Sequence, residues 1–223
     1  MKLLQMTVFV SFILYTATLS ALTSPTTGQT TEIPSVTIDY SKINKQDIKF
    51  LRRAIEVSKN ARQNGNHPFG AVLVDNKGTI VLESENTVNT GQDVTNHAEM
   101  NLVRAAQSLN NSNLAGYTLY SSCEPCAMCS GAIYWAGIKR VVYALSDEKL
   151  NQVFISDTSE SPVEDLNKYQ QKYSSRTVFG MNIDPVEIAG PTLIEEAINP
   201  HIGFWTKKGK PNPLSKEEEE KKT

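Results

Sequence analysis

Two short stretches decide how this 223-residue chain is interpreted: Thr95-Asn96-His97-Ala98-Glu99 and Cys123-Glu124-Pro125-Cys126-Ala127-Met128-Cys129. One histidine and two cysteines, here His97, Cys126 and Cys129, can bind a zinc ion and leave a fourth position open for water. A glutamate at that water, here Glu99, can accept and return its protons. Together the two stretches predict a catalytic metal site.

The spacing within each stretch favours the same interpretation. If Asn96 caps a helix that begins at His97, then His97 and Glu99 both lie in the first turn of that helix. If Pro125 opens a second helix, the two cysteines of the zinc set are three residues apart and share one face. Two helix N-termini would then converge on one cation, and their free N–H groups favour thiolate over thiol.

This constellation resembles the zinc-dependent nucleobase and nucleoside deaminases of the cytidine deaminase superfamily. Those enzymes have a His-x-Glu motif followed by Pro-Cys-x-x-Cys, here His97-Ala98-Glu99 and Pro125-Cys126-Ala127-Met128-Cys129. The resemblance is strong over residues 43–144. Within the superfamily, the sequence is similar to the bacterial branch that contains guanine deaminases and tRNA adenosine deaminases. Three further stretches extend it: His67-Pro68-Phe69-Gly70-Ala71, Glu85-Asn86-Thr87-Val88 and Ala132-Ile133-Tyr134-Trp135-Ala136-Gly137.

The resemblance implies one zinc ion per chain and hydrolytic deamination of a small nucleobase or nucleoside, with release of ammonia. Guanine or guanosine is the first expectation and cytosine or cytidine the second. Two alternatives stay open, namely a tRNA adenosine deaminase and a non-enzymatic secreted module with a structural zinc. A structural zinc normally has four protein ligands, and Cys123 is the obvious candidate for the fourth.

The resemblance also implies residues that contact the substrate. The family carries an asparagine at the position of Asn86, and an amide both donates and accepts hydrogen bonds; the alternative is a turn-forming asparagine. Phe69 is expected either to line the base pocket or to belong to the core. The main-chain N–H of Ala98 could help to fix the substrate.

Two further expectations concern the C-terminal part of the chain. Asp157 falls near the position at which guanine deaminases place a carboxylate that reads the purine. His201, Phe204 and Trp205 could close a pocket, and ordinary aromatic packing is the alternative.

The pattern of apolar residues predicts an α/β fold, a three-layer α/β/α sandwich with a mixed five-stranded sheet. An Asn and a Gly at residues 75–78 suit a hairpin turn. Successive strand-helix-strand units favour parallel pairing and place ligands at strand carboxyl ends. The expected helices are 45–63, 97–108, 126–137, 163–173 and 193–205, and residues 146–162 are expected to form a loop or a short helix. The expected strands are 70–74, 79–84, 117–121, 140–144 and 186–191.

Charge and cysteine content limit the partners. A formal net charge of −2 gives no general nucleic-acid footprint, which counts against a large RNA substrate. The three cysteines lie within seven residues and cannot form a disulfide framework across the fold. The expected partners are therefore a small nucleobase or nucleoside and water, with a homodimer implied by the resemblance.

The chain is expected to contain four segments. Residues 1–21 read as a signal peptide, because Lys2 precedes an apolar run from Leu3 to Leu19. Residues 22–42 read as a linker, 43–206 as the zinc deaminase domain and 207–223 as a charged disordered tail. The mature domain would be secreted or periplasmic and would have no membrane span. The alternatives are an uncleaved anchor and a mispredicted start.

Overall fold

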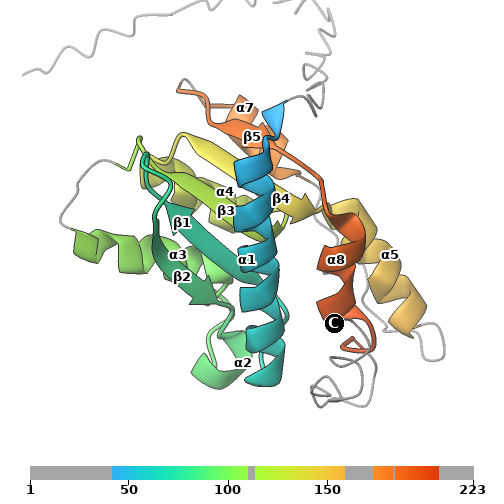
Figure 1. The fold of residues 1–223 in the computed structure, drawn as a ribbon. Coiled ribbons are helices and arrows are strands. Elements are labelled where there is room, and N and C mark those ends of the chain that lie inside the picture. Colours follow the sequence, from blue (N-terminus) through green and yellow to red (C-terminus); the bar gives the residue numbers. More distant parts are fainter. Residues whose placement is uncertain (1–41, 110–113, 159–172, 183, 206–223) are drawn as a thin grey trace, which may run out of the picture. The chain divides into compact units, whose positions relative to one another are not determined.

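A five-stranded mixed sheet forms the centre of the fold (Figure 1). β1 pairs antiparallel with β2 and with β3, whereas β3, β4 and β5 run parallel to one another. The computed structural model describes residues 42–109, 114–158, 173–182 and 184–205. The strands are, in spatial order, β2 (Ile80–Glu85), β1 (Gly70–Val74), β3 (Thr118–Cys123), β4 (Arg140–Leu145) and β5 (Glu187–Ala189).

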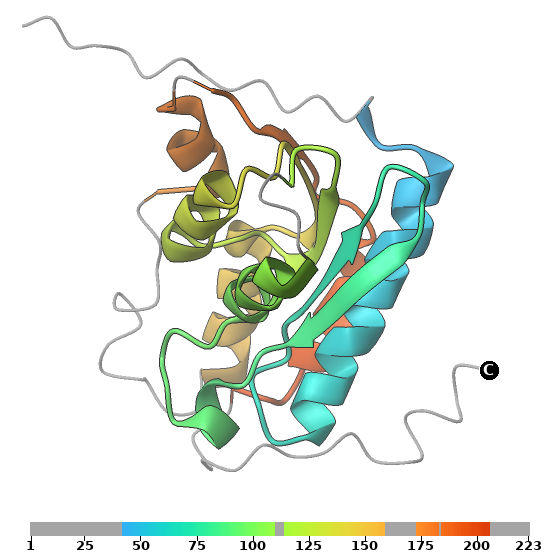
Figure 2. The ribbon, with the colours of Figure 1, turned by 90° about the vertical axis from the view of Figure 1, so that its left-hand side faces the viewer.

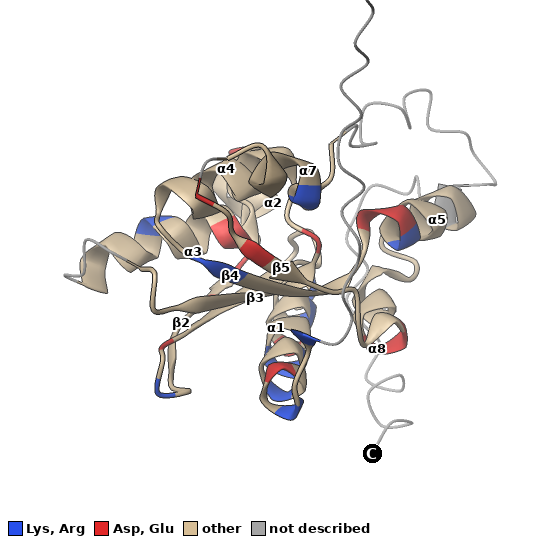
Figure 3. Ribbon diagram, turned by 90° about the horizontal axis from the view of Figure 1, so that it is seen from above, with Lys and Arg blue, Asp and Glu red and all other residues tan. Residues whose placement is uncertain are grey.

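Helices cover both faces of this sheet, and the turned views show the sheet between them (Figures 2 and 3). Side chains of β1 alternate between the two layers, with Val72 and Val74 in one apolar cluster and Ala71 and Leu73 in the other. The predicted three-layer sandwich is confirmed. One layer contains α1 (Lys45–Gln63), α5 (Asp147–Thr158) and α8 (Ile194–Ile198), and the other contains α3 (Ala98–Ala106), α4 (Ala127–Trp135) and α7 (Ser175–Gly180).

Helix α1 begins at a complete capping box. The Asn44 side chain accepts hydrogen bonds from the main-chain N–H of Gln46 and Asp47, and the Asp47 carboxylate accepts one from the Asn44 N–H. The apolar face that the sequence predicts packs on the sheet, with Leu51 and Ala54 fully buried. This helix therefore fixes one side of β1 and β3, the strands that lead to the predicted site.

The C-terminal part of the fold differs from the sequence expectation. The helix expected over 193–205 ends at Ile198 and continues as a 3₁₀ turn, Asn199–His201. Pro200 lacks the N–H that a further α-helical turn would need. Two short helices, α7 and α2 (Val88–Gly91), were not expected, because each is shorter than the window in which a helical period can be recognised.

Several expectations fall on residues outside the described ranges. They are the signal peptide (1–21), the linker apart from its last residue, the tail (207–223) and the helix 163–173 apart from its last residue. Residue 157 lies in α5, but its side chain is not among those described. Within the described ranges, no helix has the length and apolar character needed to cross a membrane.

Candidate active site

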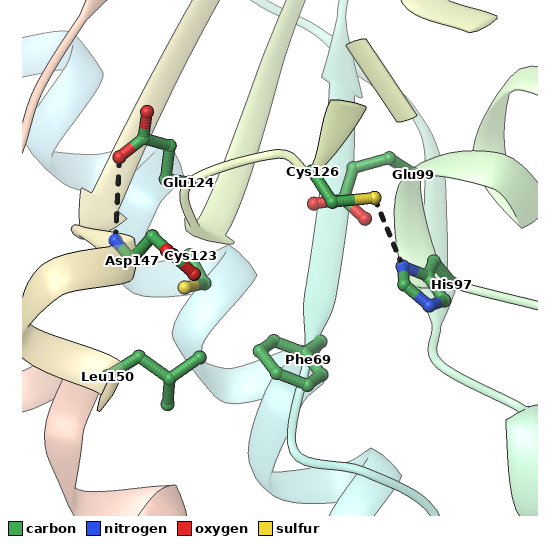
Figure 4. A pocket seen from close by; sticks show the side chains of 8 residues that line it. All are labelled: Phe69, His97, Glu99, Cys123, Glu124, Cys126, Asp147 and Leu150. Carbon is green, nitrogen blue, oxygen red and sulfur yellow. Dashed lines mark hydrogen bonds between the residues drawn. The ribbon is translucent and has the colours of Figure 1, made fainter. Parts of the chain in front are cut away.

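The candidate site lies where the parallel strands β3 and β4 end. β3 ends at Cys123 and β4 at Leu145, and these two residues are paired in register. The loops that follow lead into α4 and α5, as expected for ligand sites at strand carboxyl ends. A pocket at this edge is lined by Phe69, His97, Glu99, Cys123, Glu124, Cys126, Asp147 and Leu150 (Figure 4).

The start of α3 presents the first metal-ligand candidate. His97 is the N-cap residue with extended dihedrals, φ −67° and ψ 155°, and the helix begins at Ala98. The expectation that Asn96 caps this helix is wrong, because the Asn96 side chain instead accepts a hydrogen bond from Arg104 at 2.9 Å. The His97 ring therefore points out of the helix end, and Glu99 still lies in the first turn.

The start of α4 presents the two thiols. Cys126 is the N-cap, and its sulfur accepts a hydrogen bond from the Cys129 N–H at 3.5 Å. The helix begins at Ala127, one residue after Cys126. The three-residue separation of the cysteines thus brings both sulfurs to the same helix end, as the sequence predicts.

The two helix ends bring three donor atoms together. His97 Nδ1 lies 3.6 Å from the Sγ atoms of both Cys126 and Cys129, and the three ligand atoms lie within 4.8 Å of one another. In tetrahedral zinc sites, bond lengths of about 2.0 Å to nitrogen and 2.3 Å to sulfur place ligand atoms about 3.5 Å apart. The geometry therefore fits zinc. Cys123 is not part of this group among the described residues.

The charges at this site also fit a cation. A hydrogen bond with Cys129, opposed by burial and assisted by His97, lowers the pKa of the Cys126 thiol to about 4. The pKa of Cys129 is raised, because its hydrogen bond with Cys126 and its burial disfavour a second negative charge. A cation between the sulfurs would stabilise both thiolates, which is how cysteines bind zinc.

Glu99 lies against the pocket as a nearly buried carboxyl group, 5% exposed. Ser121 Oγ donates a hydrogen bond of 2.7 Å to Glu99 Oε1. Burial raises the pKa of Glu99, whereas the Ser121 hydrogen bond opposes that rise. The carboxyl group is thus held in place through one oxygen beside the metal ligands.

Only some of the predicted substrate-contacting residues lie at the pocket in the structure. Phe69 lines the pocket, and Ala98 is the fully buried first residue of α3. Asn86 is also buried but is not a lining residue, and its Oδ1 accepts a hydrogen bond from the Val88 N–H at 3.0 Å. That contact corresponds to the turn-forming alternative, and a substrate contact by Asn86 or Asp157 stays a prediction.

An aromatic cluster supports the Phe69 ring from behind. The ring centroid of His201 lies 5.1 Å and that of Trp205 6.1 Å from that of Phe69. Trp205 also packs on Phe154, with centroids 4.0 Å apart. Burial lowers the pKa of His201 to about 3, so this ring packs as a neutral group. Trp205 and Phe204 do not line the pocket, which corresponds to the packing alternative.

Three pocket residues were missed as site residues in the sequence. Glu124 lies inside the cysteine motif, and Asp147 and Leu150 belong to the first turn of α5. The signal that could have identified Asp147 is its position two residues after β4, because carboxyl ends of neighbouring parallel strands meet at one edge. The sequence left residues 146–162 open between a loop and a short helix, and the structure has α5 there.

Fold and site together define the class: an α/β/α protein with a three-ligand zinc site and an adjacent glutamate. The family model described as "Cytidine and deoxycytidylate deaminase zinc-binding region" matches residues 44–145. A protein of Schizosaccharomyces pombe named "Probable cytosine deaminase" is 41% identical over 165 residues, which are 74% of this chain and 96% of that relative. This chain therefore belongs to the cytidine deaminase-like superfamily of zinc-binding deaminases.

Two other similarities are more limited. The guanine deaminase of Bacillus subtilis is 46% identical over 97 residues, which are 43% of this chain and 62% of that protein. A solved structure of a guanine deaminase from Nitrosomonas europaea aligns with a TM-score of 0.54 and 20% identity, covering 68% of this chain and 80% of that one. The latter is a likeness of fold. The protein is thus an enzyme that removes an amino group from a nucleobase or nucleoside.

Proposed function

We propose that this protein deaminates a small, diffusible nucleobase, with cytosine as the first candidate. The observation that carries the reaction type is the three-ligand group with Glu99 beside it in the same pocket. Cytosine is placed before guanine because the relative that matches over 96% of its length bears the name cytosine deaminase. Guanine is the second candidate, supported by the 46% identity to the Bacillus subtilis enzyme over 97 residues.

The roles of the residues follow from their positions. When bound by His97, Cys126 and Cys129, zinc supplies a Lewis acid that lowers the pKa of a water molecule towards neutrality. Glu99 takes a proton from that water at Oε2, because Oε1 is held by Ser121. It then returns protons to the ring nitrogen and to the departing amino group. The net reaction replaces the exocyclic amino group by oxygen and releases ammonia.

A closed structural zinc site receives less support. Such a site would require a fourth protein ligand, and Cys123 is absent from the described group of ligand atoms. Cys123 fits better as an apolar wall of the pocket, where it is 3% exposed.

A large RNA substrate is also disfavoured by the surface charges. On the outer face of α1, Arg52 pairs with Glu196 and Arg53 pairs with Glu83. Lysines, arginines and acidic residues are interspersed over the described part of the chain (Figure 3). Because phosphate binding requires a cationic surface, these neutralised arginines favour a small substrate. The signal-like residues 1–21 agree with this, since an exported enzyme would be separated from tRNA; export and homodimer formation remain part of the proposal.

An ammonia-release screen tests the proposal. Purified zinc-loaded protein would be incubated separately with cytosine, cytidine, guanine, guanosine, adenine and adenosine, and ammonia would be measured enzymatically. The expected result is release from cytosine, or from guanine as the second candidate, that is lost when zinc is removed and restored by its addition. Folded, zinc-loaded protein that releases no ammonia from any of the six compounds would overturn the proposal.

A further inference from the structure

Two carboxyl groups that line the pocket have no role in the metal site or in the proton transfer assigned to Glu99. They are Glu124, which follows β3, and Asp147, the first residue of α5. Because carboxylates can only accept hydrogen bonds when ionised, each could recognise an N–H group of the substrate. Their existing hydrogen bonds decide which of the two is free to do so.

Glu124 is occupied within the protein. Its Oε1 accepts hydrogen bonds from both the N–H and the hydroxyl of Ser175, at 3.2 and 2.7 Å. Its Oε2 accepts one from the Asp147 N–H at 3.4 Å. Both oxygens therefore connect the β3 end to the starts of α5 and α7. Glu124 has a structural role in positioning these helices.

Asp147 keeps one oxygen available. Its Oδ2 accepts a hydrogen bond from the Asn151 side-chain amide at 3.2 Å, one helical turn further on. Among the described residues, Oδ1 has no hydrogen-bond or ion-pair partner. Burial and the nearby Glu124 carboxylate raise the pKa of Asp147 to about 6. Asp147 is half-buried and lines the pocket, so this oxygen can accept a hydrogen bond from a donor on a ligand.

The position of Asp147 matches one side of a bound base. Figure 4 shows His97, Cys126 and Glu99 on one side of the pocket, Asp147 and Leu150 on the other, and Phe69 between them. A base that presents its amino-bearing carbon to the metal side must direct its opposite side towards α5. Leu150 is 6% exposed, so this wall of the pocket is closed by a packed side chain.

The chemistry of the base fixes what it presents there. In cytosine the amino group is on C4, and the ring atom opposite C4 is N1, which carries a hydrogen in the free base. In cytidine the same nitrogen carries the sugar and has no hydrogen. Guanine likewise carries an imidazole N–H on the side of the bicycle away from its amino group, and guanosine carries its sugar on that ring.

We propose that Asp147 accepts a hydrogen bond from the ring N–H of a free base and thereby selects free nucleobases over nucleosides. This inference rests on the proposed deamination and specifies its substrate class. A nucleoside would lack the donor and would have to place its sugar where Asp147 and Leu150 stand. A site built to accept a hydrogen bond from a substrate N–H discriminates against an analogue that lacks this donor.

The variant Asp147→Asn is nearly isosteric and tests this selection. Its amide oxygen must face Asn151, which donates, so that its NH₂ group would face the ring N–H and repel it. We expect kcat/KM for cytosine, or for guanine, to fall at least about tenfold, mainly through KM, with no matching loss for the corresponding nucleoside. The matched control Glu148→Gln changes the neighbouring exposed carboxylate and should leave the ratio unchanged.

An unchanged ratio of base to nucleoside in folded, zinc-loaded Asp147→Asn protein would overturn the assignment. A second readout does not require turnover: calorimetric binding of pyrimidin-2-one and of its riboside, which lack the amino group. Wild-type protein should bind the free base at least about tenfold more tightly than the riboside, and Asp147→Asn should lose that preference. Selective binding without ammonia release would contradict deamination but support Asp147, whereas release without selectivity would contradict Asp147 alone.

Discussion

Two buried carboxyl groups at opposite ends of the central strands have opposite surroundings. At the start of β4, Asp47 accepts hydrogen bonds from Arg140 at 2.8 and 3.0 Å and from Tyr120 Oη at 2.8 Å. At the pocket end, Glu99 Oε1 accepts a hydrogen bond from Ser121 Oγ at 2.7 Å, and its carboxyl group also interacts with the Cys129 thiol. The exposed fractions are 1% for Asp47 and 5% for Glu99, so the contrast is one of partners.

The pKa values of the two groups move in opposite directions for this reason. Burial would raise the pKa of Asp47, but hydrogen bonds from Arg140, the Asn44 N–H and Tyr120 lower it. Burial raises the pKa of Glu99, and the hydrogen bonds from Ser121 and from its own main-chain N–H do not reverse that rise. The Asp47 network contains a full positive charge on Arg140 and stabilises the fold, whereas Glu99 has no lysine or arginine partner among the described residues. Such sites are where function is expected.

The largest expected effect is on activity and comes from replacing Glu99, the carboxyl group at the pocket. Glu99→Gln should lower kcat/KM for deamination about a thousandfold, because the amide cannot accept the proton of the water. Zinc content should stay at one ion per chain, since Glu99 is not one of the three ligands. Steady-state ammonia release and atomic emission analysis of the same preparation measure both quantities. Full activity in this variant would exclude Glu99 as the proton carrier.

The second-largest expected effect is on stability and comes from replacing Asp47, the carboxyl group away from the pocket. Asp47→Ala leaves Arg140 without its main partner and should lower the free energy of unfolding by about 3–5 kcal/mol. The kcat of the folded fraction should stay within about twofold of wild type, because the network lies away from the pocket. Urea unfolding and kinetics at low temperature measure the two effects.

A variant of the same helix supplies the control for Asp47. Glu56→Ala removes an exposed ion pair with Lys59, in which Glu56 is 52% exposed, and should cost about 0.5 kcal/mol or less. Equal losses in both variants would show that the Asp47 network has no special role in stability.

The pH dependence of stability sharpens the comparison at Asp47. Because the folded-state pKa lies below the ordinary value of 3.8, this carboxylate stabilises the fold above about pH 4. The contribution should be lost as the pH falls through the folded-state value. The difference in unfolding free energy between wild type and Asp47→Asn should accordingly be largest near pH 7 and shrink below pH 4. A difference independent of pH would mean that the Asp47 charge does not matter.

At Asp147, replacing the carboxylate should raise the free energy of unfolding, by less than the loss expected at Asp47. Its pKa is raised to about 6 by burial and by Glu124, so the folded state holds the proton more tightly than the unfolded chain. Its charge therefore destabilises the fold progressively between about pH 4 and pH 6, and the full cost remains above pH 6. Asp147→Asn should raise the unfolding free energy by about 1 kcal/mol at pH 8, after allowance for solvent screening, and by almost nothing at pH 4. Thermal unfolding at both values measures this; a loss of stability at pH 8 would contradict it.

The sequence identifies the metal ligands and Glu99, but not the pocket residues on the opposite side, Asp147 and Leu150. His97, Cys126 and Cys129 could be grouped because their roles depend on motifs of a few residues at helix starts. Asp147 could not be assigned, because it belongs to no motif and its place in the pocket depends on the parallel pairing of β3 with β4.

The same distinction applies to the fold. The hairpin of β1 and β2 and the parallel pairing of β3 with β4 follow from local turn chemistry and from the alternation of strands and helices. The cap of α3 was misassigned because Asn96 and His97 are adjacent, and only the tertiary contact of Asn96 with Arg104 selects between them. Local rules thus describe the elements, and long-range contacts decide how individual polar side chains are used.

Zinc K-edge X-ray absorption tests the central claim most directly, which is that the site has three protein ligands and an open position. Wild-type protein and Cys123→Ser should give the same first shell, with two sulfur and two nitrogen or oxygen neighbours, and Cys126→Ser should lose one sulfur. A third sulfur that disappears in Cys123→Ser would show a site closed by Cys123 and would contradict a catalytic zinc.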